Sequence, residues 1–151
     1  MSVDVTVEVE IDRPREIVAA YASNPDNIRN WYANIDAVSW LTDPPLQIGS
    51  RVSFAARFLG RKLEYTYEIV ELVPAERLVM RTAEGPFPMQ TCYTWTSTPQ
   101  GTTRMSLRNS GKLNGFSLWL APFMRMAIRR ATHKDLQLLK RILEDSAQRA
   151  D

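Results

Sequence analysis

The chain of 151 residues has the length of one domain, and its 44% hydrophobic and 24% charged residues are ordinary for a globular protein. A net charge of +2 is too small to indicate nucleic-acid binding. With one histidine and one cysteine, the chain cannot form an internal disulfide or the common zinc sites built on two histidines or on cysteine clusters.

No apolar run reaches the roughly 18 residues that span a bilayer, and the amino-terminal segment lacks the pattern of a signal peptide. We therefore expect a cytoplasmic protein with a single domain, residues 1–151, no metal and no cofactor. Its expected partner is a hydrophobic small molecule, without nucleic acid or stable membrane insertion, and it would be a monomer or a homodimer.

The first part of the chain predicts a strand followed by two short helices. Hydrophobic and polar residues alternate over residues 3–11, which is the pattern of a strand with one buried face. We expect Asp12 to cap the next helix, with Glu16 reaching back in a capping box. Residues 23–26 would end that helix and cap a second one over residues 28–31. The apolar stripe of the first helix would be formed by Ile17, Val18, Ala20 and Tyr21.

The middle of the chain predicts an antiparallel meander. Six segments of alternating polarity are separated by turns that contain glycine, proline and aspartate. Short connections of this kind favour neighbouring antiparallel strands with one face in water. The predicted strands lie at about residues 33–41, 52–58, 63–69, 78–82, 91–95 and 105–109.

The last part of the chain predicts one long amphipathic helix over about residues 116–147. Roughly thirty residues make a helix about 45 Å long, which exceeds the width of a domain of this size, so the helix must lie across the sheet. Pro122 either kinks this helix or marks the start of its main body. Its apolar stripe would be formed by Phe116, Trp119, Leu120, Phe123, Ala127, Ala131, Leu138 and Ile142.

Aromatic side chains alternate onto the strand face that points toward this helix. An aromatic wall with a few polar groups suits an amphipathic ligand such as a polyketide, a phenolic or a sterol-like compound. The alternative is a filled core in which the tyrosine hydroxyls reach the rim. The candidate ligand-binding residues are Phe54, Phe58, Tyr65, Tyr67, Met80, Phe87, Thr91, Tyr93, Trp95, Met105, Asn109, Phe116, Trp119 and Phe123.

Candidates for acid–base catalysis are few. His133 stands among arginine and lysine residues, so we expect it to face water. Glu64 and Glu68 alternate outward, while Asp36 and Glu71 would reach the inner face only through a β-bulge. No carboxylate is therefore predicted on the inner faces, and no catalytic residue is assigned.

Basic residues gather on the final helix. They could contact an anionic membrane surface or an acidic carrier protein, but the simpler interpretation is a solvated face. The residues concerned are Arg125, Arg129, Arg130, Lys134, Lys140 and Arg141.

The order of these elements is accompanied by short motifs along nearly the whole chain. These motifs are residues 7–14, 24–26 with Trp31, 48–51, 67–71 with Pro74, 77–78, 101–105, and Asp135-Leu136 with 139–140 and 143–144. In both order and motifs the sequence resembles the START-like or SRPBCC superfamily, in its polyketide cyclase/dehydrase branch. The resemblance implies an α+β helix-grip fold, in which a curved antiparallel sheet of about seven strands, two short helices and one long carboxyl-terminal helix enclose a hydrophobic cavity.

Members of this superfamily include lipid carriers, hormone receptors, plant allergens and aromatase/cyclases, so the fold alone does not decide the activity. The first hypothesis is a non-catalytic carrier or sensor of a hydrophobic or aromatic small molecule. The second is a polyketide cyclase, aromatase or dehydratase that acts on a ligand in the same cavity. The third is a structural or interaction protein with a vestigial cavity.

Overall fold

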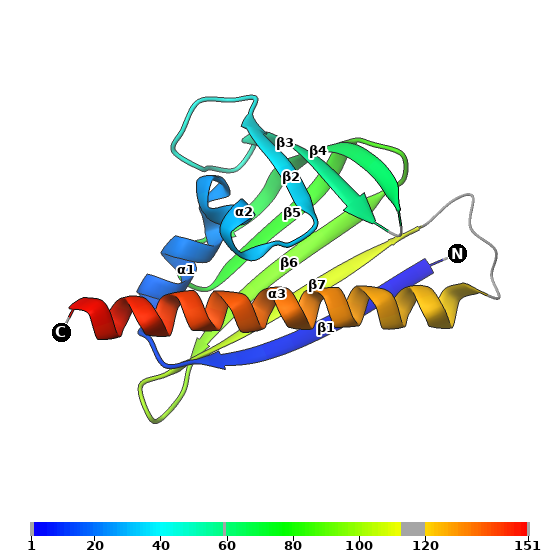
Figure 1. Ribbon diagram of the computed structural model, residues 1–151. Coiled ribbons are helices and arrows are strands. Elements are labelled where there is room, and N and C mark those ends of the chain that lie inside the picture. The colour runs from blue at the N-terminus through cyan, green and yellow to red at the C-terminus, as the bar shows by residue number, and fades with distance from the viewer. Residues whose placement is uncertain (1, 59, 113–119, 151) are drawn as a thin grey trace.

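Seven antiparallel strands form one curved sheet, and a long helix lies across it (Figure 1). The computed structural model describes residues 2–58, 60–112 and 120–150. The strand order in the sheet is β1-β7-β6-β5-β4-β3-β2. The elements are β1 (Ser2–Ile11), α1 (Arg15–Ser23), the 3₁₀ turn η1 (Pro25–Asn27), α2 (Ile28–Trp31), β2 (Ile35–Trp40), β3 (Arg51–Phe58), β4 (Arg61–Val73), β5 (Arg77–Glu84), β6 (Met89–Ser97), β7 (Thr103–Lys112) and α3 (Ala121–Ala150). The predicted helix-grip order is confirmed.

Strand β1 shows why the sheet has one dry face. Its odd-numbered residues, from Val3 to Ile11, are all buried, and its even-numbered residues are all exposed. β1 pairs with β7, so the first and last strands of the chain are neighbours in the sheet. The helix α3 packs directly against β1, which places the buried valines of β1 beneath it. The period-two pattern thus assigns the face that receives the helix.

The capping prediction for the first helix is wrong. The N-cap residue is Pro14, which makes no side-chain capping bond, and the backbone N–H of Asp12 donates instead to the Glu144 carboxylate at 2.9 Å. The buried residues of α1 are Val18, Ala19 and Ala22, whereas the expected Ile17 and Ala20 are exposed. The helix begins three residues after Asp12, beyond the reach of its side chain, and its apolar face is turned accordingly.

The second short helix begins as predicted. The Asn24 side chain accepts a hydrogen bond from the backbone N–H of Asp26 at 3.0 Å, which starts the 3₁₀ turn η1. Helix α2 follows directly and ends at Trp31, whose side chain is fully buried. Together these turns bring Trp31 over the sheet, where its ring lies 5.8 Å from that of Tyr93.

The described long helix, Ala121–Ala150, presents a different apolar stripe from the predicted one. It starts at Ala121 with Pro122 in its first turn, so the proline marks the start of α3 and makes no internal kink. Phe123 is 63% exposed. Leu138 and Ile142 pack only at the margin of the core. The fully covered apolar residues of α3 are Met124, Leu136, Leu139 and Leu143. Two adjacent stripes of the helix are apolar. The stripe that packs on the sheet is displaced by one residue from the predicted stripe. Phe116 and Trp119 lie outside the described residues.

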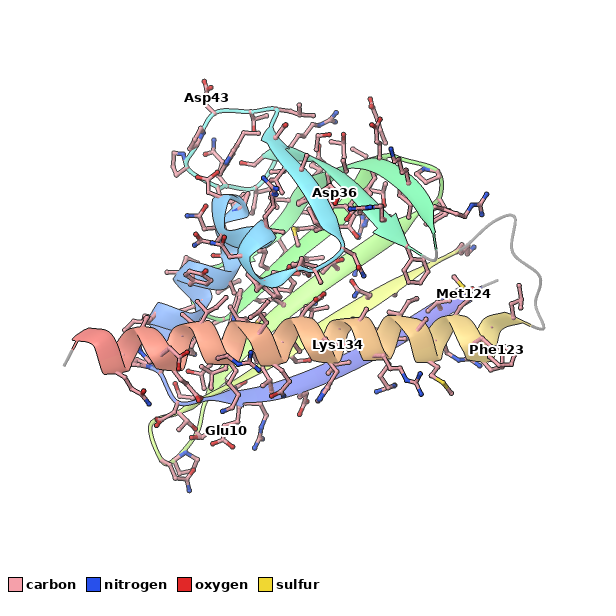
Figure 2. The ribbon with its side chains drawn as sticks, viewed as in Figure 1. Glu10, Asp36, Asp43, Phe123, Met124 and Lys134 are labelled. Carbon is pink, nitrogen blue, oxygen red and sulfur yellow. The ribbon has the colours of Figure 1, made fainter. Side chains whose placement is uncertain are left out.

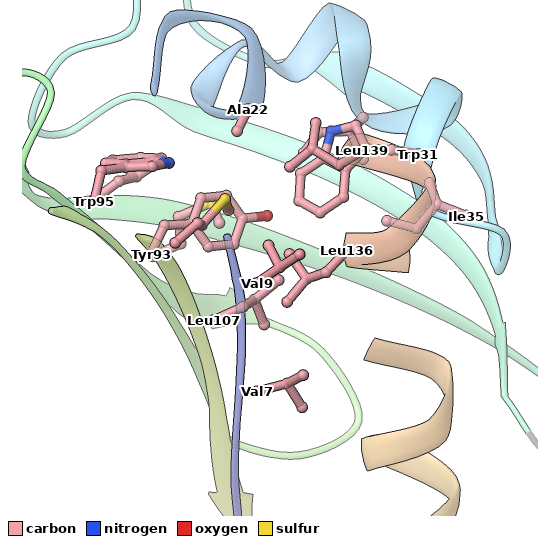
Figure 3. Packing of buried hydrophobic residues seen from close by; sticks show 14 of the residues in the cluster. Val7, Val9, Ala22, Trp31, Ile35, Tyr93, Trp95, Leu107, Leu136 and Leu139 are labelled. Atoms are coloured by element: carbon pink, nitrogen blue, oxygen red, sulfur yellow. The ribbon is translucent and has the colours of Figure 1, made fainter. Parts of the chain in front are cut away.

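The core is densest beneath the carboxyl-terminal half of α3. Leu136 and Leu139 of the helix meet Val9 and Leu107 of the sheet, and Trp31 closes the cluster from the side (Figure 3). None of the helices in residues 2–58, 60–112 and 120–150 is long and apolar enough to cross a membrane.

Candidate functional site

A cavity of about 200 Å³ lies between the amino-terminal half of α3 and the inner face of the sheet. Strands β3, β4 and β6 supply most of its wall, α2 and β2 close one side, and α3 closes the top. The residues that line it are Val3, Ile28, Tyr32, Asn34, Ile35, Phe54, Ala56, Arg57, Phe58, Arg61, Leu63, Tyr65, Tyr67, Met80, Phe87, Met89, Gln90, Thr91, Tyr93, Asn109, Ser110, Gly111, Met124, Ile128, Ala131, Thr132 and Asp135.

Most of the candidate ligand-binding residues of the sheet lie on this wall. They are Phe54, Phe58, Tyr65, Tyr67, Met80, Phe87, Thr91, Tyr93 and Asn109. Trp95 and Met105 are buried but belong to the filled core, where they are register partners on β6 and β7. Phe123 points away from the cavity into solvent, and Phe116 and Trp119 fall outside the described residues. Strand alternation therefore placed the inner face, while the position along each strand decided which residues border the cavity.

The aromatic wall is built from β3 and β4. Phe54 and Tyr65 are register partners, and their rings stack with centroids 5.4 Å apart. Tyr67 meets Tyr65 edge-on at 5.0 Å and Phe54 at 5.7 Å. Aromatic rings held in such offset and edge-to-face arrangements keep each other in place. The wall therefore offers a rigid apolar surface to a flat molecule.

A chain of hydrogen bonds crosses the sheet at one side of the cavity. The Thr91 hydroxyl donates to Asn109 Oδ1 at 2.8 Å, and the Tyr67 hydroxyl lies 2.9 Å from the Thr91 oxygen. Because Thr91 has one proton and gives it to Asn109, Tyr67 must be the donor to Thr91. The chain leaves the amide N–H groups of Asn109 as donors at the cavity wall, suited to a carbonyl or a phenolate oxygen.

Two phenols form a second polar site. The hydroxyl oxygens of Tyr32, at the end of α2, and Tyr93, on β6, are 2.7 Å apart and share a hydrogen bond. Burial raises the pKa of both well above the ordinary value, and the neighbouring charges add to the shift. Burial likewise raises the pKa of Tyr65, and that of Tyr67 to about 12. These phenols stay protonated at neutral pH, so they can donate hydrogen bonds but cannot serve as bases.

The cavity contains a carboxylate that sequence reasoning missed. Asp135 lies on α3, is 5% exposed, and lines the cavity. Its Oδ1 accepts a hydrogen bond from the backbone N–H of Ala33 at 3.2 Å. Burial raises the pKa of Asp135 to about 6, against the lowering effect of that hydrogen bond. Asp135 also contributes to the raised pKa of Tyr32 and Tyr93, so it lies close to the phenol pair.

A signal for Asp135 was present in the sequence. Met124, Asp135 and Leu139 recur at helical spacing on the stripe that the structure buries. An acidic residue on an apolar stripe is unusual, because a buried carboxylate costs free energy unless it is paired or protonated. The signal was hidden because the predicted stripe was displaced by one residue.

The other acidic candidates lie outside the cavity. Asp36 adjoins a register shift in β2, and its carboxylate binds the Arg57 guanidinium at 2.9 and 3.0 Å. Glu71 adjoins a register shift in β4 and pairs with Arg77 at 3.1 Å on the outer face. The bulges are real, but neither turns its carboxylate inward.

His133 is exposed, as expected. In the part of the chain that the structure describes, no three histidine, cysteine, aspartate or glutamate side chains gather as metal ligands do. Among the described residues that line the cavity, Asp135 is the candidate base and several phenols are candidate hydrogen-bond donors. Near neutral pH both forms of Asp135 are accessible, which is the condition for a proton acceptor or donor.

A protein-family model matches most of the chain. Residues 2–144 match the family model described as polyketide cyclase/dehydrase and lipid transport. Comparison of the sequence with curated proteins finds no match.

Solved structures share the fold at low sequence identity. The protein TTHA0849 from Thermus thermophilus superposes with a TM-score of 0.81 at 16% identity, covering 95% of this chain and 98% of the other. An aromatase/cyclase, Zhui from Streptomyces sp. R1128, gives 0.79 at 14% identity, with 95% and 94% coverage. A START superfamily protein from Mycobacterium smegmatis gives 0.70 at 13% identity, with 98% and 99% coverage.

Proposed function

Because the chain belongs to the polyketide cyclase/dehydrase and lipid transport family, we propose that it binds a small amphipathic molecule, aromatic or polyketide-like, in the cavity beneath α3. The observation that carries the proposal is the aromatic wall of β3 and β4 together with the polar groups of Asn109, Asp135 and the Tyr32–Tyr93 pair. Such a mixture orients a ligand while burying its apolar surface.

Energetics favour an occupied cavity. At about 24 cal/mol per Å³, an empty apolar space of about 200 Å³ costs about 5 kcal/mol. That cost is large beside a total stability of about 5–15 kcal/mol. A ligand that fills the cavity offsets part of this free-energy cost. The volume is below the roughly 300–1,000 Å³ of pockets for drug-sized molecules, so the ligand would be small, of about two fused rings.

The proposal is tested with naphthols and aromatic ketones as probes, by native mass spectrometry and thermal unfolding. A bound probe should appear at one per chain, and at 100 times its Kd it should stabilise the protein by about 2.7 kcal/mol. Ala131→Leu puts extra carbons into the cavity and should weaken binding at least about tenfold. The matched control is Ala127→Leu, one turn earlier on α3 and off the cavity wall.

If no probe of the panel binds in either assay, the proposal is wrong. It is also wrong if Ala131→Leu and Ala127→Leu, both shown to be folded by circular dichroism, bind the probes equally well.

A second candidate function is proton transfer on a bound poly-carbonyl substrate, as in a cyclase or dehydratase. The observation that favours it is Asp135, a buried carboxyl whose pKa is raised to about 6 by desolvation. Its carboxylate would take a proton from a carbon flanked by two carbonyls. The Tyr32–Tyr93 pair would donate a hydrogen bond to the carbonyl oxygen on which negative charge develops.

One experiment with a linear poly-β-ketone thioester distinguishes the two candidate functions, binding alone and proton transfer. An enzyme should convert it at a rate that rises as the pH passes about 6, because the base is the ionised form. Asp135→Asn should lower that rate by roughly 100-fold or more while keeping substrate binding. Glu71→Gln, whose carboxylate pairs with Arg77 at residues that do not line the cavity, should leave both the rate and the binding unchanged. If the unaltered protein binds the thioester without converting it, the second candidate function is wrong and only the carrier function remains.

A further inference from the structure

The side of α3 that faces away from the sheet has an unusual composition. We call this surface the outer face of α3. All of its residues are exposed, and they recur at helical spacing: Phe123, Met126, Arg130, His133, Lys134, Gln137 and Arg141. Figure 2 shows Phe123 and Met124 leaving the start of the helix on different sides, with Lys134 further along. Met124 enters the cavity wall, and Phe123 enters solvent.

Positive charge is concentrated on this helix. From Ala121 to Leu143 it carries six lysine or arginine residues and one acidic residue, Asp135, which is buried; Glu144 and Asp145 follow near its end. Since the whole chain has a net charge of +2, the remaining residues are net negative. Among the described side chains, Lys140 alone of the six forms an ion pair, with Glu144 at 2.7 Å. Arg130, Lys134 and Arg141 therefore present their charge to solvent.

Two large apolar side chains stand at the start of this basic face. Phe123 is 63% exposed and Met126 is 51% exposed, one turn apart. A purely solvated helix face does not need them, and leaving them in water forfeits the free energy of their burial. A soluble polyanion would match the charge but would leave both side chains uncovered. A partner that complements both the basic residues and the exposed apolar side chains presents negative charge at its surface and an apolar layer beneath it.

We propose that the outer face of α3 docks on an anionic lipid bilayer. Phe123 and Met126 insert among the acyl chains, while Arg130, Lys134 and Arg141 contact the headgroups. Basic residues beside exposed apolar ones are the pattern of helices that lie in the membrane interface. The inference does not depend on what the cavity holds. Docking would leave the cavity-lining side chains of Met124 and Ile128 on the opposite side of the helix from the bilayer.

Flotation of the purified protein with vesicles tests the proposal. The protein should bind vesicles of phosphatidylcholine with phosphatidylglycerol, and should bind pure phosphatidylcholine at least about tenfold more weakly. Raising the salt from about 0.1 M to about 0.5 M should weaken the binding at least about tenfold, because the Debye length shrinks.

Matched pairs of variants locate the surface. Phe123→Ser should reduce vesicle binding at least about threefold, whereas Ile48→Ser, at a residue that is 65% exposed on the β2–β3 connection, should not. Arg130→Glu with Lys134→Glu should reduce it at least about tenfold. Lys62→Glu with Arg104→Glu, exposed on β4 and β7, should change it less than about twofold. All these side chains are exposed, and unchanged thermal unfolding checks that each variant is folded.

The proposal is overturned if the protein does not bind the anionic vesicles, or if the two variants of each pair behave alike. It is also overturned if polyglutamate or a DNA duplex binds more tightly than the vesicles and Phe123→Ser leaves that binding unchanged. Those results would assign the basic face to an acidic protein or to a nucleic acid.

Discussion

The two halves of α3 meet the same sheet in different ways. Beneath the carboxyl-terminal half, Leu136, Leu139 and Leu143 are buried in a continuous core. Beneath the amino-terminal half, Met124, Ile128 and their neighbours border a cavity.

Polar contacts hold both halves of α3 against the first part of the chain, at different places. The carboxyl-terminal half is tied to the segment after β1, where Arg13 Nη1 donates to the Leu143 carbonyl at 2.6 Å and the Asp12 N–H donates to Glu144 at 2.9 Å. Near the start of α3, Arg129 donates to the Thr6 carbonyl at 3.1 Å.

The cavity therefore arises from what lies opposite the helix rather than from the helix itself. Helices α1 and α2 lie toward the carboxyl-terminal half of α3 (Figure 1), and α2 contacts α3 directly. The buried Trp31 of α2 fills the space there, in contact with Tyr93 and beside Leu139 (Figure 3). At the other half, the side chains of the strands alone do not fill the gap. The fold thus combines a packed end with an end that keeps a cavity.

The greatest loss of stability is expected when a large apolar side chain is truncated at the packed end of α3, and the loss should be smaller at the cavity. Leu139→Ala, at a fully buried position, should lower the free energy of unfolding by about 2–5 kcal/mol, because it opens a void in a packed region. Ile128→Ala, at a half-buried position on the cavity wall, loses less buried apolar surface and should cost about 1 kcal/mol. Urea unfolding measures both. Equal losses would contradict the division into a packed end and a loose end.

The second effect is a dependence of stability on pH that arises at the cavity. Asp135 has a folded-state pKa of about 6 against 3.8 in the unfolded chain, so between these values the folded state holds more protons. The free energy of unfolding should therefore fall by about 3 kcal/mol as the pH rises from about 4 to about 6, at 1.36 kcal/mol per pKa unit. Above pH 6 it should stay at this lower value. Asp135→Asn should remove that loss, so at pH 8 the variant should be the more stable protein.

Asp36→Asn is the control for this experiment. Its carboxylate is exposed and paired with Arg57, so the stability loss between pH 4 and pH 6 should persist in this variant. Thermal unfolding in buffers across this range gives the comparison. An unaltered pH profile in Asp135→Asn would show that Asp135 is not the group responsible.

The third effect concerns the polar chain at the cavity. Thr91→Val keeps the shape of the side chain but removes the hydroxyl that links Tyr67 to Asn109. Leaving both partners unpaired should cost about 2 kcal/mol of folding free energy, since the site is largely buried. A bound phenol should restore part of the loss by hydrogen bonding to Asn109. Chemical unfolding with and without 1-naphthol measures this, and a ligand-independent loss would contradict a role for the chain in binding.

The smallest effect belongs to the packed end. Arg13→Gln removes the hydrogen bonds of the guanidinium to the Leu143 carbonyl and to Ser146, and should cost about 1 kcal/mol. The bonds lie near the end of α3, so hydrogen exchange should increase in its last turns and not at Met124. Arg104→Gln, at an exposed position on β7, is the matched control without such bonds to α3. Faster exchange along the whole helix would contradict the idea that its two halves are held separately.

Local patterns predicted much of the fold correctly. The alternation over residues 3–11 is enough for β1, and Asn24 followed by Pro25 and Asp26 is enough for η1, because both depend on neighbours in the chain. The cap of α1 was predicted wrongly because Asp12 is drawn into a backbone contact with Glu144, at the far end of the sequence. The displaced stripe of α3 has a similar cause. Two neighbouring stripes have comparable hydrophobicity, and only the partner surface selects between them.

Residue periodicity was enough to predict the order of the elements, the inner face of each strand and the aromatic character of the wall. Where the wall ends and the packed core begins depends on the tertiary structure, which places Trp95 and Met105 in the core and not on the cavity lining. The tertiary structure also decided that Asp135 lies inside the cavity and Phe123 outside it. The physical reason is that a helix is placed by the sum of its contacts, and a rotation of one residue exchanges what is buried for what is exposed.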